Sequence, residues 1–168
     1  FTVRTGAPVL ASQPAAGHPD QVFVDGAPLS EVLTRDAVVP GTFFRDVPRD
    51  LLVIGDDPAG HLVEASDLPW AFYFDDADGS SLTNVTVRRY ATPADDMAAV
   101  RAYSDDMSVR GLISELNAHS GLSVIGAHVS VSWSVLRDNG YIGMHAHLAD
   151  DITLYRSEIV GNNRQGFD

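Results

Sequence analysis

The amino-acid sequence predicts an all-β protein in which a small antiparallel β unit precedes a parallel β-helix of about four coils. Asparagine recurs at spacings of 22 and 23 residues, as Asn117, Asn139 and Asn162, which indicates a structural repeat. Glycine follows each asparagine four residues later, at Gly121, Gly143 and Gly166. Before each asparagine, apolar residues alternate with polar ones, which is the pattern of a β-strand with one buried face.

The first unit is predicted to span residues 1–66, where no repeat is found. Short strand-like runs in this part are separated by Pro- and Gly-containing turns. The runs are QVFVDG (21–26), GTFFRD (41–46), LLVIGDD (51–57) and HLVEAS (61–66). Only SEVLTRDAV (30–38) has the pattern of one or two helical turns. We therefore expect a β-hairpin unit that caps the coils.

The β-helix is predicted to span residues 67–168 and to be incomplete at its C-terminus, with two strand-like runs in each repeat. A leucine-rich solenoid has a similar repeat length, but it requires leucine at several fixed offsets and usually a helical turn. The alternation assigns the residues that point into the bore: Phe72, Phe74, Val100, Ala102, Leu122, Val124, Met144, Ala146 and Phe167 in the first run, and Leu82, Val87, Val109, Val131, Leu136, Leu154 and Ile159 in the second.

The recurring asparagines have a structural interpretation. An asparagine at a tight turn tolerates left-handed geometry, and its amide can bond to the backbone of a neighbouring coil. In the first coil Tyr90 takes the asparagine position, 27 residues before Asn117. We expect this row to stabilise the stack and not to take part in catalysis.

Charge and composition exclude several classes of partner. Acidic residues outnumber basic ones 23 to 11, which gives a net charge of −12. A nucleic-acid partner is not expected, because binding a phosphate backbone requires a surplus of Lys and Arg. The chain has no cysteine, and we expect no membrane insertion because no stretch approaches 18 apolar residues.

The two-run coils and the Asn and Gly rows resemble the pectate-lyase-like right-handed parallel β-helix superfamily. The first half is similar to the segment that precedes the coils in bacterial secreted carbohydrate-active proteins, in the run QVFVDGAPL, then PGTFFRD, then LLVIGDDPAGHLVEAS. The resemblance implies an extracellular or cell-surface protein that acts on or binds a polysaccharide. It does not fix an activity, because one fold carries many functions. An incomplete helix would also expose strand edges at its end, where self-association is expected.

The resemblance implies that a polysaccharide lies along the outer face of the first-strand sheet. One outward row of that face is Tyr73, Arg101, Ser123, His145 and Asp168, and the next row is Asp75, Tyr103, Ile125 and His147. We predict His145, Asp168 and His147 as catalytic residues, with Arg101, Tyr73 and Tyr103 binding the substrate. A carboxylate beside an imidazole fixes its tautomer, as a general base requires.

These groups favour a polysaccharide lyase over a hydrolase. In β-elimination, Arg101 or a cation would neutralise a uronate carboxylate, His145 would act as the base, and Tyr103 or His147 would act as the acid. Hydrolysis normally requires two carboxyl groups flanking the bond. Asp75 and Asp168 are too far apart for that role. The alternatives are ordinary solvated side chains, a non-catalytic carbohydrate-binding or adhesive module, and a purely structural module.

An acidic turn follows the first strand in several coils. Asp76, Asp78, Asp105 and Asp106 fall near one corner, where stacked carboxylates could hold Ca²⁺. The third coil has His128 at this corner, and solvated turn aspartates are the alternative interpretation.

Overall fold

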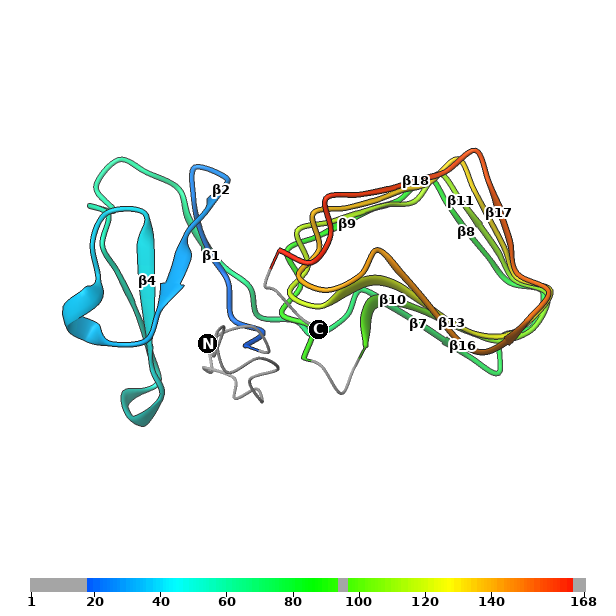
Figure 1. Cartoon of the computed structure of the whole chain (residues 1–168), viewed down its shortest axis with the longest axis horizontal. Helices are drawn as coiled ribbons and strands as arrows, with labels where there is room; N and C mark the ends of the chain where they lie inside the picture. The colour runs from blue at the N-terminus through cyan, green and yellow to red at the C-terminus, as the bar shows by residue number, and fades with distance from the viewer. Residues whose placement is uncertain (1–17, 94–96, 165–168) are drawn as a thin grey trace.

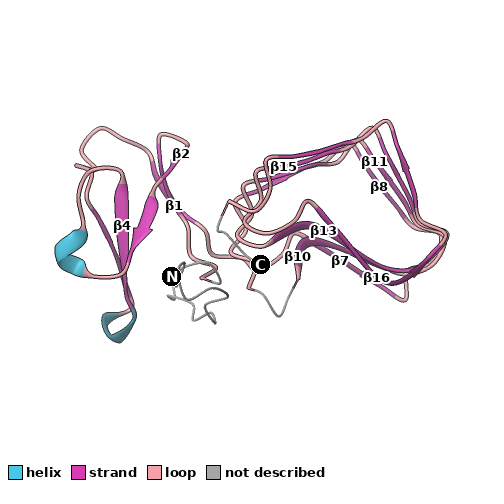
Figure 2. Cartoon of the chain, viewed as in Figure 1, coloured by secondary structure: helices cyan, strands magenta, loops and turns pink. Residues whose placement is uncertain are grey.

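The computed structural model describes residues 18–93 and 97–164 of the chain. It is all-β, with a small N-terminal unit beside a parallel β-solenoid (Figure 1). The only helical segments among the described residues are two single 3-10 turns in the N-terminal unit (Figure 2). The predicted fold class, a stack of parallel β coils after an antiparallel unit, is confirmed.

Two three-stranded sheets form the N-terminal unit. The first has the antiparallel order β2-β1-β6, and the second has the order β3-β4-β5, in which β4–β5 is antiparallel and β3–β4 is parallel. The strands are β1 (Val22–Val24), β2 (Ala27–Pro28), β3 (Ser30–Val32), β4 (Thr42–Asp46), β5 (Leu51–Ile54) and β6 (Val63–Ala65). The helical turns are η1 (Arg35–Ala37) and η2 (Val47–Arg49), so the run 30–38 contains one helical turn preceded by a strand.

The solenoid passes through three parallel sheets, each with four strands. The first sheet contains β7 (Phe72–Asp75), β10 (Ala98–Tyr103), β13 (Ser120–Ala127) and β16 (Met144–Asp150). The second contains β8 (Ser81–Thr83), β11 (Ser108–Arg110), β14 (Ser130–Ser132) and β17 (Thr153–Tyr155). The third contains β9 (Thr86–Arg88), β12 (Ile113–Glu115), β15 (Val135–Arg137) and β18 (Glu158–Val160). In Figure 1 these coils nearly superimpose as one three-sided outline.

Each coil therefore has three strands and not the two runs expected from the sequence. The second run bends at one residue in the left-handed region, which is Asn84, Gly111, Trp133 or Arg156 in successive coils (φ 54°, 65°, 54° and 47°). The backbone N–H at this corner still bonds to the next coil, as from Asn84 to the Arg110 carbonyl at 2.8 Å. Because Trp and Arg rarely adopt this conformation, the sequence gives little sign of the bend.

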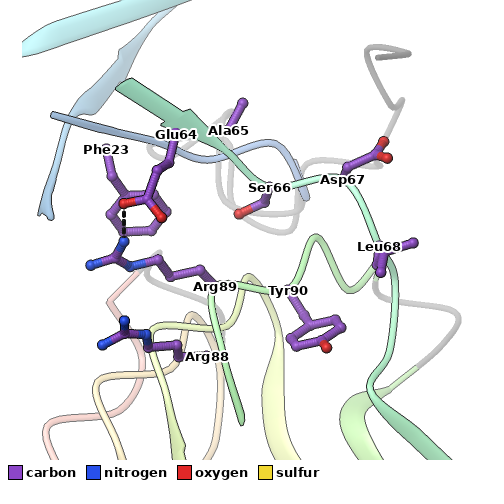
Figure 3. Close-up of a pocket in the computed structure, with 9 residues that line it drawn as sticks. All are labelled: Phe23, Glu64, Ala65, Ser66, Asp67, Leu68, Arg88, Arg89 and Tyr90. Atoms are coloured by element: carbon purple, nitrogen blue, oxygen red, sulfur yellow. Dashed lines mark hydrogen bonds and ion pairs between the residues drawn. The ribbon is translucent and has the colours of Figure 1, made fainter. Parts of the chain in front are cut away.

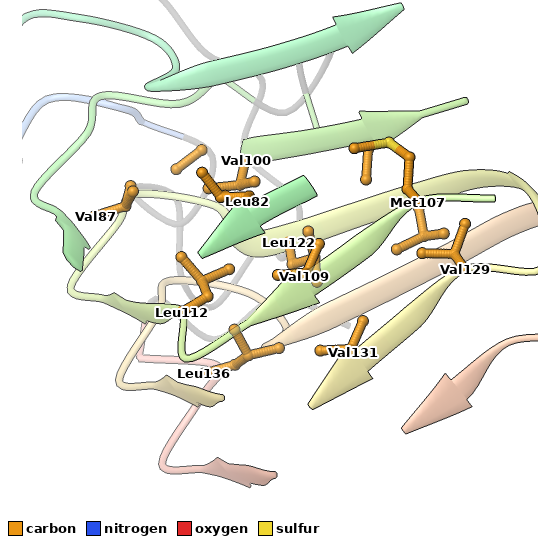
Figure 4. Packing of buried hydrophobic residues seen from close by; sticks show 13 residues of the cluster. Leu82, Val87, Val100, Met107, Val109, Leu112, Leu122, Val129, Val131 and Leu136 are labelled. Carbon is orange, nitrogen blue, oxygen red and sulfur yellow. The ribbon is translucent and has the colours of Figure 1, made fainter. Parts of the chain in front are cut away.

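Aliphatic side chains stacked in register fill the bore (Figure 4). On the first sheet Val100 lies opposite Leu122, and on the second Val109 lies between Leu82 and Val131. Most of the described members of the predicted inward set belong to the core cluster, and Ser114 occupies the third-sheet position between Val87 and Leu136. In the last coil, the predicted inward residues Ala146, Leu154 and Ile159 are exposed. Phe167 and Gly166 lie outside the described residues. Neighbouring coils share one core, so no coil buries its inner face alone.

The asparagine row forms a hydrogen-bonded ladder between coils, as predicted. The expected left-handed geometry is not at the asparagines but at the residues before them, Leu116, Asp138 and Gly161. The Nδ2 of Asn117 donates to the Oδ1 of Asn139 at 2.9 Å, and Asn139 donates in the same way to Asn162 at 3.0 Å. Each Oδ1 also accepts a backbone N–H from the preceding coil, including that of Tyr90 at 3.1 Å. The ladder explains the glycine row, because a Cβ on Gly121 would lie 2.8 Å from the Asn139 Nδ2.

The two ends of the bore differ. In the first coil the rings of Phe72 and Phe74 stack with centroids 6.2 Å apart, and Leu82 is only 6% exposed. In the last coil the equivalent of Leu82 is Leu154, which is 47% exposed, and Ile159 is also exposed. Apolar core positions therefore reach the surface at the end formed by β16, β17 and β18.

Arg89 joins the N-terminal unit to the solenoid. Its guanidinium pairs with Glu64 and lies over the Phe23 ring, with Cζ 4.5 Å from the centroid. These groups line a pocket of about 270 Å³ whose walls come from β1, from β6 and the segment after it, and from the end of β9 (Figure 3). The pair is partly shielded from water, so its attraction is less screened than that of a surface pair.

Candidate functional site

The outward row of the first sheet has the predicted register. Arg101 on β10 pairs with Tyr73 on β7 and with Ser123 on β13, and Ser123 pairs with His145 on β16. These side chains point outward because they alternate with Val100 and other bore residues along the same strands. Asp168, the predicted last member of the row, lies outside the described residues.

A β-bulge changes the second outward row. The ladder between β13 and β16 runs through Val124 opposite Ala146 and resumes with Gly126 opposite Ala149. Ile125 therefore faces two residues, His147 and Leu148, and the expected single pair of Ile125 with His147 does not form. Bulges re-aim side chains, and here the His147 ring stacks on that of His145 with centroids 6.0 Å apart.

Arg101 is held by aromatic rings. Its guanidinium carbon lies 4.5 Å from the centroid of Trp70 and 5.4 Å from that of Tyr73, and the residue is only 8% exposed. The rings themselves are open to solvent, with Trp70 39% and Tyr73 48% exposed. Tyr103 extends the cluster, since its ring meets Tyr73 edge to face at 5.5 Å. The outermost surface here is therefore aromatic, with the cation beneath it.

The tyrosine hydroxyls of this cluster are positioned by polar neighbours. The Tyr73 hydroxyl donates to the Asp75 carboxylate at 3.2 Å, and the Tyr103 hydroxyl is 3.2 Å from the Ser123 hydroxyl. Partial desolvation, together with the bond to Asp75, raises the pKa of Tyr73 above its ordinary value. Tyr73 is therefore a hydrogen-bond donor at neutral pH.

At the other end of the face, His145 lies near a further histidine, His119. The Nδ1 of His145 is buried, and no hydrogen-bond partner for it is found in residues 18–93 or 97–164. His119, which the sequence interpretation left out, places Nδ1 2.6 Å from the Met97 carbonyl. Because a carbonyl only accepts, this nitrogen carries the proton and Nε2 has the lone pair in the neutral ring. Burial lowers the pKa of His119, and a charge on His145 lowers it further.

Tyr141 and Trp70 were also missed by sequence reasoning. The Tyr141 ring packs on His119 with centroids 4.9 Å apart. Trp70 belongs to the stretch SDLPW, which reads as a turn, and His119 precedes its strand by one residue. An exposed tryptophan two residues before a strand was the available signal, but its contact with Arg101 arises only when β7 and β10 are stacked.

The aspartates of the acidic corner are engaged with the backbone. Asp78 accepts the Asp105 N–H at 2.9 Å, and Asp105 accepts the Ala127 N–H at 2.7 Å. Asp106 is 3.3 Å from the Nδ1 of His128, while Asp76 has a left-handed backbone. Within the described parts of the chain, no group of three or more His, Asp or Glu side chains is arranged to hold a metal ion. The expected Ca²⁺ site therefore has no geometric support.

The described residues include no helix of the length and apolar character that a membrane span requires. Comparison with known proteins found no matching family model, no matching curated protein and no matching solved structure. The structure shows a β-solenoid, and the resemblance to the pectate-lyase-like superfamily stays a prediction.

Proposed function

We propose that this protein binds a polysaccharide along the outer face of its first sheet. The observation that carries the proposal is the pair of exposed rings, Trp70 and Tyr73, with the Arg101 guanidinium held between them. Aromatic rings offer rigid apolar area that suits the C–H face of a sugar, and the adjacent hydroxyls of Tyr73 and Tyr103 suit its polar edges. Such a ligand fits an extracellular or cell-surface location.

In this proposal Arg101 does not bind a substrate carboxylate directly. Its π faces contact two rings, and little of the side chain reaches solvent. We expect it to orient the rings by cation–π attraction, worth about 0.5–2 kcal/mol, and to supply positive potential beneath them. In a chain of net charge −12, that local potential favours an acidic sugar at this face.

Lyase-type acid–base chemistry is the catalytic form of the proposal. A base would remove the C5 proton of a uronate, the C4–O bond would break to give a C4–C5 double bond, and an acid would protonate the leaving oxygen. His145 is the proposed base, with Tyr103 or His147 as the acid. His119 adds a third imidazole beside His145 and His147, and the Met97 carbonyl fixes its tautomer.

A non-catalytic binding module is the second candidate. The state of His145 favours this candidate. A general base needs a hydrogen-bond partner that fixes its tautomer, and the His145 Nδ1 has none among the described residues. In this case the rings would bind the chain and the histidines would be surface residues.

Binding by the face is tested with Trp70→Ala and Tyr73→Ala. Affinity electrophoresis in gels containing neutral or uronate polysaccharides should show each variant binding roughly tenfold more weakly, the loss of one stacked ring at about 1.4 kcal/mol. Leu68→Ala removes a neighbouring exposed apolar side chain and serves as the control. Unchanged retardation of both ring variants on every polymer that the wild type binds would sink the proposal.

Turnover separates the two candidates. Ultraviolet absorbance detects the unsaturated product of β-elimination from uronate polymers. Loss of this signal in His145→Ala, with retained binding, supports the lyase. Binding without product in the wild-type protein, sensitive to Trp70 but not to His145, supports the non-catalytic module.

A further inference from the structure

A second aromatic cluster lies at the corner between the second and third sheets, away from the face described above. Trp133 follows β14, and its ring lies 4.7 Å from the Cζ of Arg156 and 5.5 Å from that of Arg110. Tyr155 ends β17, with its ring 5.0 Å from the Arg156 Cζ and edge to face with Trp133. Both rings are about half exposed, at 46% and 51%.

The two arginines of this corner differ from most others in the protein. Arg35, Arg45, Arg49, Arg89 and Arg137 each pair with an Asp or Glu. Within residues 18–93 and 97–164, Arg110 and Arg156 have no carboxylate within ion-pair distance, although acidic residues outnumber basic ones twofold in the chain. Stacking occupies the flat face of a guanidinium and leaves its N–H edge able to bind an anion with two parallel hydrogen bonds.

The corner does not need these side chains for its backbone. The equivalent positions in the first two coils are Asn84 and Gly111, which adopt a left-handed conformation at low cost. Trp133 and Arg156 adopt it at φ 54° and 47°, where a bulky side chain is sterically disfavoured. Strained residues with exposed side chains are typical of binding sites.

We propose that the corner cluster of Arg110, Trp133, Tyr155 and Arg156 binds the carboxylate or sulfate groups of an extended acidic saccharide. Arg110 ends β11 and Arg156 follows β17, two coils apart and roughly 10 Å along the solenoid axis, so they would contact charges on successive parts of one saccharide chain. Nucleic acid fits poorly, because two cations on a strongly acidic protein neutralise too few phosphates. The site is independent of the proposed function, since it uses a different face.

The test is calorimetric titration with oligogalacturonate and with sulfated oligosaccharide, beside a neutral cello-oligosaccharide, at low and raised salt. We expect the double variant Arg110→Gln/Arg156→Gln to bind the acidic probes at least tenfold more weakly and to lose most of the salt dependence. Trp133→Gly should also weaken binding, and it suits the left-handed backbone, so the fold is retained. His128→Gly changes another exposed left-handed corner residue and is the matched control.

Trp70→Ala separates this site from the first-sheet face. This variant should reduce binding at the first-sheet face and leave the affinity of the corner cluster for the acidic probes unchanged. The proposal is overturned if neither acidic probe binds the wild-type protein, or if the double variant binds them like the wild type. Equal binding of the neutral probe, with the same dependence on the two arginines, would also overturn it.

Discussion

Replacing Asn139 with alanine removes the middle rung of the buried asparagine ladder. Asn139 is fully buried. Its Oδ1 accepts two hydrogen bonds from Asn117, one from the backbone N–H at 3.2 Å and one from the Nδ2 at 2.9 Å. Its own Nδ2 donates to the Ser114 carbonyl at 3.1 Å and to Asn162. The substitution takes these partners from the Asn117 N–H and the Ser114 carbonyl at a place that water does not reach.

A buried polar group left without a partner costs about 1–3 kcal/mol, so losing two partners should lower the free energy of unfolding by about 2–6 kcal/mol. Domains of this size are stable by only about 5–15 kcal/mol, which makes the loss a large share of the total. Asn162→Ala removes the same kinds of bond at the exposed end of the stack, where water can replace them. Its expected cost is about 1 kcal/mol.

Urea unfolding followed by far-ultraviolet circular dichroism measures both costs. We expect the midpoint to fall several-fold further in Asn139→Ala than in Asn162→Ala, with little effect of either on binding at the first sheet. Equal costs in the two variants, or a cost below about 1 kcal/mol in Asn139→Ala, would refute the view that burial makes the ladder essential.

The buried His119 and the exposed apolar side chain of Leu154 each affect a measurable property of the protein. Because burial lowers the pKa of His119 in the folded protein, the unfolded chain takes up its proton first as the pH falls below about 6.5, and stability decreases in this window. His119→Asn keeps a donor toward the Met97 carbonyl, so it should lose less stability than the wild type between about pH 7.5 and about pH 5 in urea titrations; equal losses would contradict this. Leu154 is an exposed core position on β17, so we expect concentration-dependent association through this apolar surface in sedimentation velocity, and a monomer in Leu154→Lys. A wild-type protein that stays monomeric at every concentration would contradict the association.

The candidate face was only partly predictable. Strand alternation and repeat length sufficed to place Tyr73, Arg101 and His145 in one outward row, because both are properties of the local chain. The bulge beside His147 was not predictable, since an extra residue in one coil becomes visible only against the strand of the coil before it. The contact of Trp70 with Arg101 joins residues on different coils and was hidden for the same reason.

What the sequence alone determined was the architecture of the coils: the repeat, the bore residues and the asparagine ladder. These follow from period-two alternation and from a spacing that brings identical side chains into register one coil apart. The tertiary structure alone decided the three-strand shape of each coil, the burial of Arg101 beneath rings and the corner cluster around Trp133. These three features depend on residues with a left-handed backbone or on contacts between coils. No pattern within a single stretch of the sequence predicts a left-handed Trp or Arg, or a contact between residues on different coils.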